Sequence, residues 1–220
     1  MAAHDIRGPL GVVLSAGSML EREVKTEHGK MLVDLACEAA EEMESLLNGL
    51  LDMSAIESAS ISINLEKINL TSLLEKVVQD VQLIAQDKGQ KLDLDTPVQA
   101  IWVNADEVRI KEVVQNLISN AIKYSPEGVQ IEISIFQTDD GIELRISDNG
   151  LGIPKEFLGK VFERLFRVPT GNVHDVKGFG LGLSYVKNVV ERHNGTIYVE
   201  SEPNSGSTFI MKLKFNPNLA

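Results

Sequence analysis

The sequence predicts an α+β protein in which a helical hairpin, pairing into a dimeric four-helix bundle, precedes an α/β sandwich. Two observations carry this prediction. Residues 1–62 repeat apolar side chains at steps of three and four, the spacing of a helix that packs against other helices. From about residue 69 onward, helical periods are interspersed with short stretches of alternating apolar and polar residues, the pattern of strands.

The hairpin has two apolar seams. The first helix is predicted over roughly residues 4–23, with its seam at Ile6, Leu10, Val13, Gly17, Leu20 and Val24. The second seam comprises Leu32, Leu35, Ala39, Met43, Leu46, Leu50 and Met53. Two helices alone bury too little apolar surface to be stable, so we expect two hairpins to pair in a homodimer. The hairpin is assigned to residues 1–62 and the second domain to residues 63–220.

The second domain begins after a linker, predicted at residues 58–68, where the helical period is lost. Thr71 is expected to cap a helix from Leu73 to about Lys88, and another helix is predicted over residues 107–123. Strands are predicted near residues 100–104, 129–136, 142–147, 196–200 and 207–215. Strands with helices packed on one face form a sandwich, which leaves the opposite side of the helices free to hold a ligand.

Two motifs in this domain indicate a nucleotide-binding site. In the first, Asn116 and Asn120 share one helix face, with Lys123 and Tyr124 at the helix end. Such an amide pair suits the magnesium and phosphate edge of a nucleotide. In the second, the strand over residues 142–147 delivers the carboxylate of Asp148 into a turn that Gly150 and Gly152 allow to bend tightly. A buried carboxylate there can accept a hydrogen bond from an adenine amino group.

A third motif is a group of glycines at the start of a helix. Gly178, Gly180 and Gly182 precede an amphipathic run over residues 183–192. Bare backbone amides at a helix start can approach phosphates without interference from side chains. Each of the three motifs is weak evidence alone, but their order and their spacing over about sixty residues favour one site.

Taken together, these motifs resemble the catalytic core of a sensor histidine kinase of a two-component system. Its ATP-binding fold is shared with gyrase-type and heat-shock chaperone ATPases. The resemblance covers essentially the whole chain. VFERLFRV at residues 161–168 is similar to the phenylalanine box, GSTF at 206–209 to the closing glycine-threonine element, and HDIRGPL at 4–10 to the phosphoacceptor box.

This resemblance implies ATP and Mg²⁺ as cofactors and a role for each site residue. His4 would take the γ-phosphoryl group, with Asp5 as the base, before transfer to an aspartate in the receiver domain of a response regulator. Asn120 would help to hold the metal. The nucleotide would be bound by Asn116, Lys123, Tyr124, Asp148, Gly150, Gly152, Arg167, Gly178, Gly180, Gly182 and Thr208. The segment over residues 155–177 is interpreted as a mobile lid over ATP.

Two departures from the family pattern affect the expected activity. Gly8 stands where the family usually has Thr or Asn, so phosphatase activity is doubtful. The chain begins three residues before His4, whereas the family's helix starts well upstream. We therefore expect a shortened piece of a longer sensor, with impaired activity because His4 lies in a helical turn that frays.

Composition excludes several other classes of function. The formal net charge of −11 argues against direct binding to nucleic acid or anionic membranes. No uninterrupted run of about 18 apolar residues is present, so we expect no membrane contact by this segment. A single cysteine, Cys37, fits a packed side chain in a reducing compartment, and the expected location is cytoplasmic. This expectation concerns the segment alone, because a sensor region outside it could be membrane-bound.

Two alternatives remain open: a hydrolysing ATPase of the same fold, and a nucleotide-binding scaffold without chemistry. Related ATPases activate water with a Glu four positions before the magnesium-binding Asn, and that position is Asn116 here. A neutral amide cannot accept the proton, which disfavours hydrolysis, and Glu112 one turn earlier is a weaker candidate. Phe162 and Phe166 are interpreted either as core residues or as a surface that docks on the hairpin.

Overall fold

The computed structural model describes residues 2–37, 39, 40, 43, 63–169 and 180–214, of which 2–8, 21 and 22 are described by their backbone only. The chain forms two compact units, Met1–Ile61 and Ser62–Ala220. The first is helical and the second combines helices with β-sheet, so the predicted fold class is confirmed.

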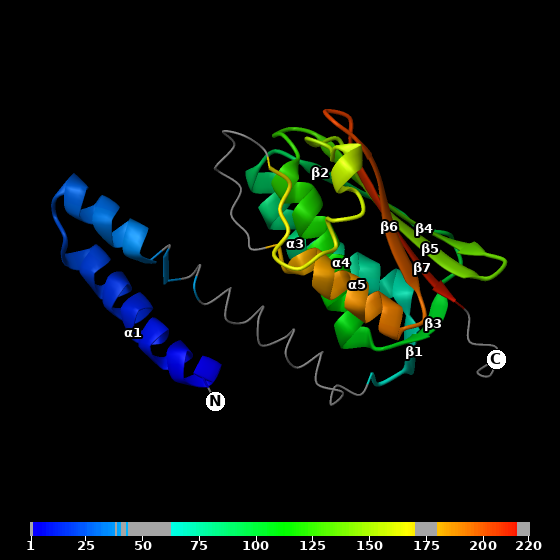
Figure 1. Ribbon diagram of the computed structural model, residues 1–220, viewed down its shortest axis with the longest axis horizontal. Helices are drawn as coiled ribbons and strands as arrows, with labels where there is room; N and C mark the ends of the chain where they lie inside the picture. The colour runs from blue at the N-terminus through cyan, green and yellow to red at the C-terminus, as the bar shows by residue number, and fades with distance from the viewer. Residues whose placement is uncertain (1, 38, 41–42, 44–62, 170–179, 215–220) are drawn as a thin grey trace. The chain divides into compact units, whose positions relative to one another are not determined.

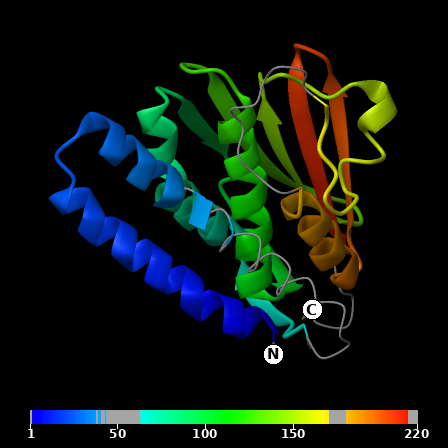
Figure 2. The ribbon, with the colours of Figure 1, turned by 60° about the vertical axis from the view of Figure 1, so that its left-hand side comes forward.

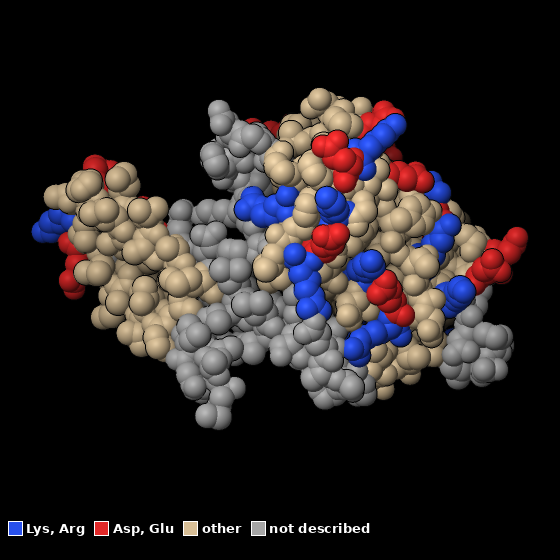
Figure 3. Space-filling model, in the orientation of Figure 1, with Lys and Arg blue, Asp and Glu red and all other residues tan. Residues whose placement is uncertain are grey.

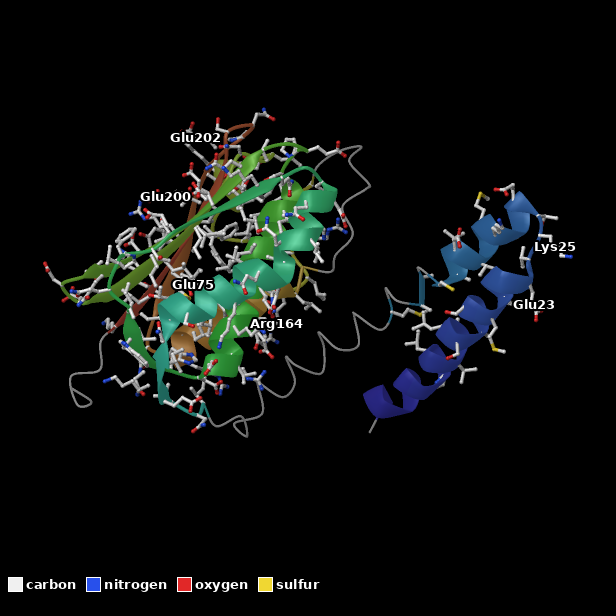
Figure 4. All side chains as sticks on the ribbon, turned by 180° about the vertical axis from the view of Figure 1, so that it is seen from behind. Glu23, Lys25, Glu75, Arg164, Glu200 and Glu202 are labelled. Carbon is white, nitrogen blue, oxygen red and sulfur yellow. The ribbon has the colours of Figure 1, made fainter. Side chains whose placement is uncertain are left out.

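The first unit is a helical hairpin. Helix α1 spans Ala2–Glu23, as predicted, and residues 27–37 form a second helical segment after a short turn. Figure 4 shows Glu23 and Lys25 at this turn. Thr26 caps the second segment, because its hydroxyl oxygen accepts a 3.1 Å hydrogen bond from the amide of Gly29.

The two helices of the hairpin approach each other closely at Gly17. A side chain at this position would collide with the sulfur of Cys37 on the second helix. Gly17 therefore allows the contact, and Cys37 is a packed side chain, as its sequence context indicates. The part of the second predicted seam beyond Met43 lies outside the described residues.

Three helices build one layer of the second unit. Helix α3 spans Leu70–Asp87, α4 spans Glu107–Tyr124 and α5 spans Gly182–Arg192. The predicted cap of α3 is wrong: Asn69, not Thr71, accepts the hydrogen bond from the Ser72 amide at 3.1 Å. Thr71 lies inside the helix, and its hydroxyl oxygen accepts the amide of Ile101. Both residue types cap helices well, so local sequence does not decide between them.

The other layer is a five-stranded sheet of order β2-β4-β5-β7-β6. Its strands are β2 (Lys91–Asp95), β4 (Gln130–Thr138), β5 (Gly141–Asp148), β6 (Thr196–Glu202) and β7 (Gly206–Lys214). Strand β2 pairs with β4 in parallel, and the other pairs are antiparallel. A separate ribbon joins β1 (Glu66–Asn69) to β3 (Trp102–Ala105).

Two of these strands differ from the sequence prediction. Strand β2 was not predicted, although its residues alternate. Strand β1 occupies the end of the segment predicted as a linker, residues 58–68, of which 58–62 lie outside the described residues. A four-residue strand is stabilised by its partner rather than by its own sequence, so the pairing with β3 decides it.

Helices α3, α4 and α5 cover one face of the sheet (Figures 1 and 2). The core between the layers includes Leu70, Leu74, Ile110, Leu117, Ile118, Ile131, Ile133, Ile142, Leu144 and Ile146, all almost fully buried. On the other face of the sheet, Phe136 and Tyr198 are more than a third exposed. The short helix η1 (Lys155–Phe157) and a series of turns begin the segment predicted as a lid, and residues 170–177 of that segment lie outside the described residues.

Candidate nucleotide-binding site

The two amides predicted at the phosphate edge lie on helix α4. Its apolar face, which includes Val113, Leu117 and Ile118, packs into the core and leaves the Asn116 and Asn120 side chains half-buried at its margin. The side-chain amide of Asn116 donates a 3.1 Å hydrogen bond to the carbonyl oxygen of Glu112. This bond fixes the rotation of the amide, so its oxygen is directed away from α4 toward the start of α5.

Helix α5 begins at Gly182, directly against Asn116. A Cβ atom at position 182 would lie 2.5 Å from the Asn116 side-chain oxygen, which is closer than real Cβ contacts come. A side chain here would have to displace the Asn116 amide, so glycine allows the start of α5 to lie directly beside Asn116. Gly180 lies two residues earlier, and its carbonyl oxygen accepts the Leu165 amide at 3.0 Å. Gly178 lies outside the described residues.

The end of α4 carries a cluster of cations. The Lys123 ammonium lies 5.3 Å from the centroid of the Tyr124 ring. Burial lowers the pKa of Lys123, and the positive charges of Arg167 and Lys88 lower it further. Burial also raises the pKa of the Tyr124 hydroxyl, against the influence of Arg167. Arg167, from the segment after β5, thus lies near both residues, and this concentration of positive charge suits an anionic ligand.

Asp148 ends strand β5 with its carboxylate on the helix-covered side of the sheet. Its residue is 8% exposed, and its Oδ1 accepts the Gly150 amide at 2.8 Å. Burial raises the pKa of Asp148, and hydrogen bonds from the Gly150 and Ser207 amides oppose that shift. A buried carboxylate at the end of a strand is suited to accept one further hydrogen bond from a neutral donor.

The turn after Asp148 is held from three sides. The Leu151 amide donates to the carbonyl oxygen of Tyr124 at 3.3 Å, which joins the turn to the end of α4. The Ile153 amide donates to the Ser201 hydroxyl oxygen at 2.8 Å. Gly152 has a φ of 68° and lies against the carbonyl oxygen of Glu202, where a side chain would collide. A Cβ at Gly150 would lie 2.5 Å from the carbonyl oxygen of Tyr124, so the surrounding backbone accounts for both glycines of this motif.

Thr208 is a predicted nucleotide-binding residue, within the described part of the second unit, that the structure does not bring to this cluster. It pairs with Ser147, whereas its neighbour Ser207 pairs with Asp148. Because successive side chains of a strand point to opposite faces, Thr208 lies on the face away from Asp148, and its hydroxyl donates to Ser147 at 3.0 Å. Ser207 contacts the carboxylate instead, through its amide.

Two groups of polar contacts at this site were not predicted from sequence, although Glu112 was considered as a weaker candidate base. Gln90 is 3% exposed, and its side-chain amide donates to the carbonyl oxygens of Ile122, Ser125 and Pro126 at 2.8 to 3.1 Å, which fixes the end of α4. Arg109, Glu112 and Tyr185 form a second group between α4 and α5. The local pattern does not reveal these contacts, because Gln90 is 32 positions from Ile122, and Tyr185 is 73 and 76 positions from Glu112 and Arg109.

The predicted phosphoacceptor residues belong to the other unit. His4, Asp5 and Gly8 lie in the first turns of α1, and their side chains are outside those described. Within the described residues, no group of three or more His, Cys, Asp or Glu side chains is placed to hold a metal ion. Asn120, one turn beyond Asn116, carries a side-chain amide oxygen, a type of ligand that Mg²⁺ accepts.

Lys and Arg side chains lie among Asp and Glu side chains on the face that carries α4 and α5, although the net charge of the chain is −11 (Figure 3). Arg164 lies on this helix side of the second unit (Figure 4). No helix among the described residues is long and apolar enough to cross a membrane.

Comparison with known proteins identifies the families that this chain matches. Residues 105–217 match the model of the histidine kinase-, DNA gyrase B- and HSP90-like ATPase family. Residues 1–59 match the model of the histidine kinase A phosphoacceptor domain. The chain is 32% identical over 220 residues to the sensor protein RprX of Bacteroides fragilis, which covers 98% of this chain and 42% of that protein. The chain thus spans less than half of this relative.

Two solved structures share the fold. Full-length ShkA in complex with AMPPNP superposes with a TM-score of 0.79 and 24% identity, covering 96% of this chain and 44% of that one. Histidine kinase ThkA in complex with the response regulator protein TrrA gives a TM-score of 0.72 and 23% identity, covering 100% and 61%. At these identities the likeness concerns the fold alone.

The second unit is an α/β sandwich in which α4 carries Asn116 and Asn120, a tight turn follows the buried Asp148, and α5 begins at Gly182. This combination is that of an ATPase-type nucleotide-binding domain. The chain belongs to the family of histidine kinase-, DNA gyrase B- and HSP90-like ATPases. With the phosphoacceptor-domain match before it, the resemblance to a sensor histidine kinase of a two-component system is confirmed. The family also supports ATP as the nucleotide.

Proposed function

We propose that this chain is the kinase core of a sensor protein, which uses ATP to phosphorylate His4 and then passes the phosphoryl group to an aspartate of a response regulator. The observation that carries this proposal is the convergence of Asn116, Lys123, Asp148 and Gly182 from three distant motifs. The match of residues 1–59 to a phosphoacceptor domain supplies the acceptor.

Different residues of the site would bind the adenine, the phosphates and the metal ion of the nucleotide. The buried carboxylate of Asp148 would accept a hydrogen bond from the adenine amino group, with Tyr124 beside the base. Lys123 and Arg167 would neutralise phosphate charge, and the start of α5 would supply backbone amides. Mg²⁺ would be held by Asn120 together with the phosphates, and it would offset charge on the transferred group.

The transfer step needs a nucleophile and little else from the protein. In phosphoryl transfer the protein mainly positions the γ-phosphate and stabilises charge. A neutral imidazole of His4 would attack the γ-phosphorus, the bond to ADP would break, and the proton displaced from the ring would pass to Asp5. We infer domains of residues 1–62 for dimerisation and phosphate acceptance and 63–220 for ATP binding.

Two partners follow from this function. Exposed apolar residues on the hairpin, among them Val12, Met19 and Leu35, support a homodimer in which two hairpins pair. A response regulator would take the phosphoryl group, as the partner named with ThkA suggests. We place this segment in the cytoplasm, where ATP is available.

Hydrolysis without transfer is the weaker candidate. The only carboxylate near Asn116 that the sequence offers as a base is that of Glu112. Its Oε2 is 3.0 Å from the Arg109 guanidinium, and it also accepts the hydroxyl of Tyr185. A carboxylate with these two partners is a poor base for water, so transfer to histidine is favoured.

The test is incubation with γ-labelled ATP and Mg²⁺. We expect label that is lost in acid and stable in alkali, absent from His4→Gln and from Asp148→Ala. His28→Gln is the matched control, because His28 is an exposed histidine of the same unit, and it should be labelled normally. Steady phosphate release that survives His4→Gln would support an ATPase instead. Nucleotide binding with neither product, also after the upstream helix is restored, would support a scaffold.

A further inference from the structure

Helices α4 and α5 meet at two points that lie one turn apart. At the first, Gly182 lies against the side-chain oxygen of Asn116. At the second, the Tyr185 hydroxyl donates a hydrogen bond to Oε2 of Glu112. Glu112 precedes Asn116 by four residues and Tyr185 follows Gly182 by three, each about one helical turn. The two contacts therefore fix the position of α5 along α4.

The second contact is a three-residue polar cluster at the edge of the core. Arg109 Nη1 lies 3.0 Å from Glu112 Oε2 and 3.4 Å from the Tyr185 hydroxyl oxygen. Tyr185 is 8% exposed, and burial raises the pKa of its hydroxyl, as does the bond to Glu112. The hydroxyl thus stays protonated and donates to an ionised acceptor, which makes the hydrogen bond stronger than one between neutral groups.

Two structural connections link this polar cluster to the candidate nucleotide-binding residues. Along α4, the backbone carbonyl of Glu112 accepts the side-chain amide of Asn116 at 3.1 Å, so the residue that binds Tyr185 also orients Asn116. Along α5, Tyr185 lies in the first turn of the helix that Gly182 begins. A slip of α5 by a fraction of a turn would break the Tyr185 bond and change the distance between the Gly182 backbone and Asn116 together.

We propose that Tyr185 is a positioning residue for nucleotide binding, which acts through Glu112 to hold the amides at the start of α5 beside Asn116. The residue touches no part of the ligand in this scheme. The inference rests on the proposed function, since the ligand of these amides is the phosphate chain of ATP. It goes further by naming the residues outside the binding motifs that set the geometry of the phosphate edge.

The experiment measures the Kd of AMPPNP with Mg²⁺ by calorimetry, and the melting temperature without nucleotide, for matched variants. Tyr185→Phe removes one oxygen and keeps the ring. We expect its Kd to rise about three- to tenfold, the effect of losing one hydrogen bond. Tyr198→Phe is the control, because Tyr198 is a partly exposed tyrosine on the far face of the sheet. Its Kd should equal that of the wild type.

Substitutions of Glu112 test whether Tyr185 acts through its hydrogen bond to Glu112. Glu112→Gln keeps an acceptor oxygen but loses the charge, so its Kd should lie between those of the wild type and Glu112→Ala. Glu112→Ala should bind at least as weakly as Tyr185→Phe, because it also removes the ion pair with Arg109. The double variant Glu112→Ala/Tyr185→Phe should bind no more weakly than Glu112→Ala alone, because both changes remove the hydrogen bond between Tyr185 and Glu112.

Two results would overturn the inference, and they differ from a failure of the proposed function. A lowered melting temperature with an unchanged Kd in Tyr185→Phe would show a structural role only. Additive losses in the double variant would show that Tyr185 does not act through Glu112. A wild-type chain that binds no nucleotide would instead refute the proposed function itself, and this inference with it.

Discussion

The two units of this chain differ in how completely they bury their own apolar residues. In the second unit the helices and the sheet enclose a core of almost fully buried side chains. In the described part of the hairpin, only Leu10 and Ala40 are buried apolar residues, while Met19 and Leu35 are more than 60% exposed. The second unit is therefore built to fold around its own core, and the hairpin is built to pack against something else.

This comparison predicts that substitutions in the second unit change nucleotide affinity, whereas substitutions in the hairpin change the dissociation constant of the dimer. The largest effect is expected for Asp148→Ala, which should weaken nucleotide binding by about 100-fold, because it removes a buried acceptor and leaves an adenine donor unpaired. The dimer should be unaffected. Asp139→Ala, at an exposed aspartate between β4 and β5, is the control. Equal binding by both variants would contradict the role of Asp148.

Asp148 also gives the site a pH dependence. Because burial raises its pKa above the ordinary value, its ionised form is lost at a higher pH than for an exposed aspartate. Binding should weaken as the pH falls through that raised pKa, since the protonated carboxyl loses acceptor strength.

In the hairpin, Leu35→Glu should act on assembly. Leu35 is 62% exposed, and a charge on the predicted seam would oppose its burial against a second hairpin. We expect the dissociation constant of the dimer to rise at least about tenfold by sedimentation, with unchanged Kd for AMPPNP. Leu83→Glu makes the same change at an exposed leucine of α3. If both variants dissociate alike, the hairpin is not the dimer interface.

Within the second unit, Gly182→Ala isolates the contact between α5 and α4. The added methyl group would lie 2.5 Å from the Asn116 side-chain oxygen, so either that side chain must rotate away or the start of α5 must move. We expect AMPPNP affinity to fall about tenfold, a loss near 1.4 kcal/mol. Gly159→Ala is the matched control, because a Cβ at that position meets no atom within 4 Å. Equal affinities would mean that the approach to Asn116 does not matter for binding.

The sequence predicted those parts of the fold that depend on local pattern. Helix α4 was expected over residues 107–123 and spans Glu107–Tyr124, because its apolar spacing is a local pattern. The side of the sheet on which Thr208 lies could not be predicted. A shift of one residue in the pairing of β5 with β7 decides whether Ser207 or Thr208 lies beside Asp148. The same holds for Tyr185 and Glu112, which are 73 positions apart.

The smallest expected effect concerns the face of the sheet away from the helices. Glu143 is 5% exposed there, between Arg145 at 2.6 Å and Lys212 at 3.0 Å. Burial by itself would raise the pKa of Glu143, but hydrogen bonds from Lys212 and Arg145 lower it overall. Because both cations are partly exposed, we expect Glu143→Gln to cost only about 1 kcal/mol at neutral pH, with no change in nucleotide affinity.

The sign of the pH dependence follows from the lowered pKa. A carboxyl group with a lowered pKa in the folded state stabilises the protein above its unfolded pKa, and this contribution disappears as the pH falls through the folded value. The difference in unfolding free energy between wild type and Glu143→Gln should therefore vanish in acid. Urea unfolding monitored by Trp102, the single tryptophan, measures it. Glu132→Gln, an exposed glutamate on β4, should show no such difference, and a gap that persists in acid would mean that Glu143 stabilises the sheet by packing rather than by charge.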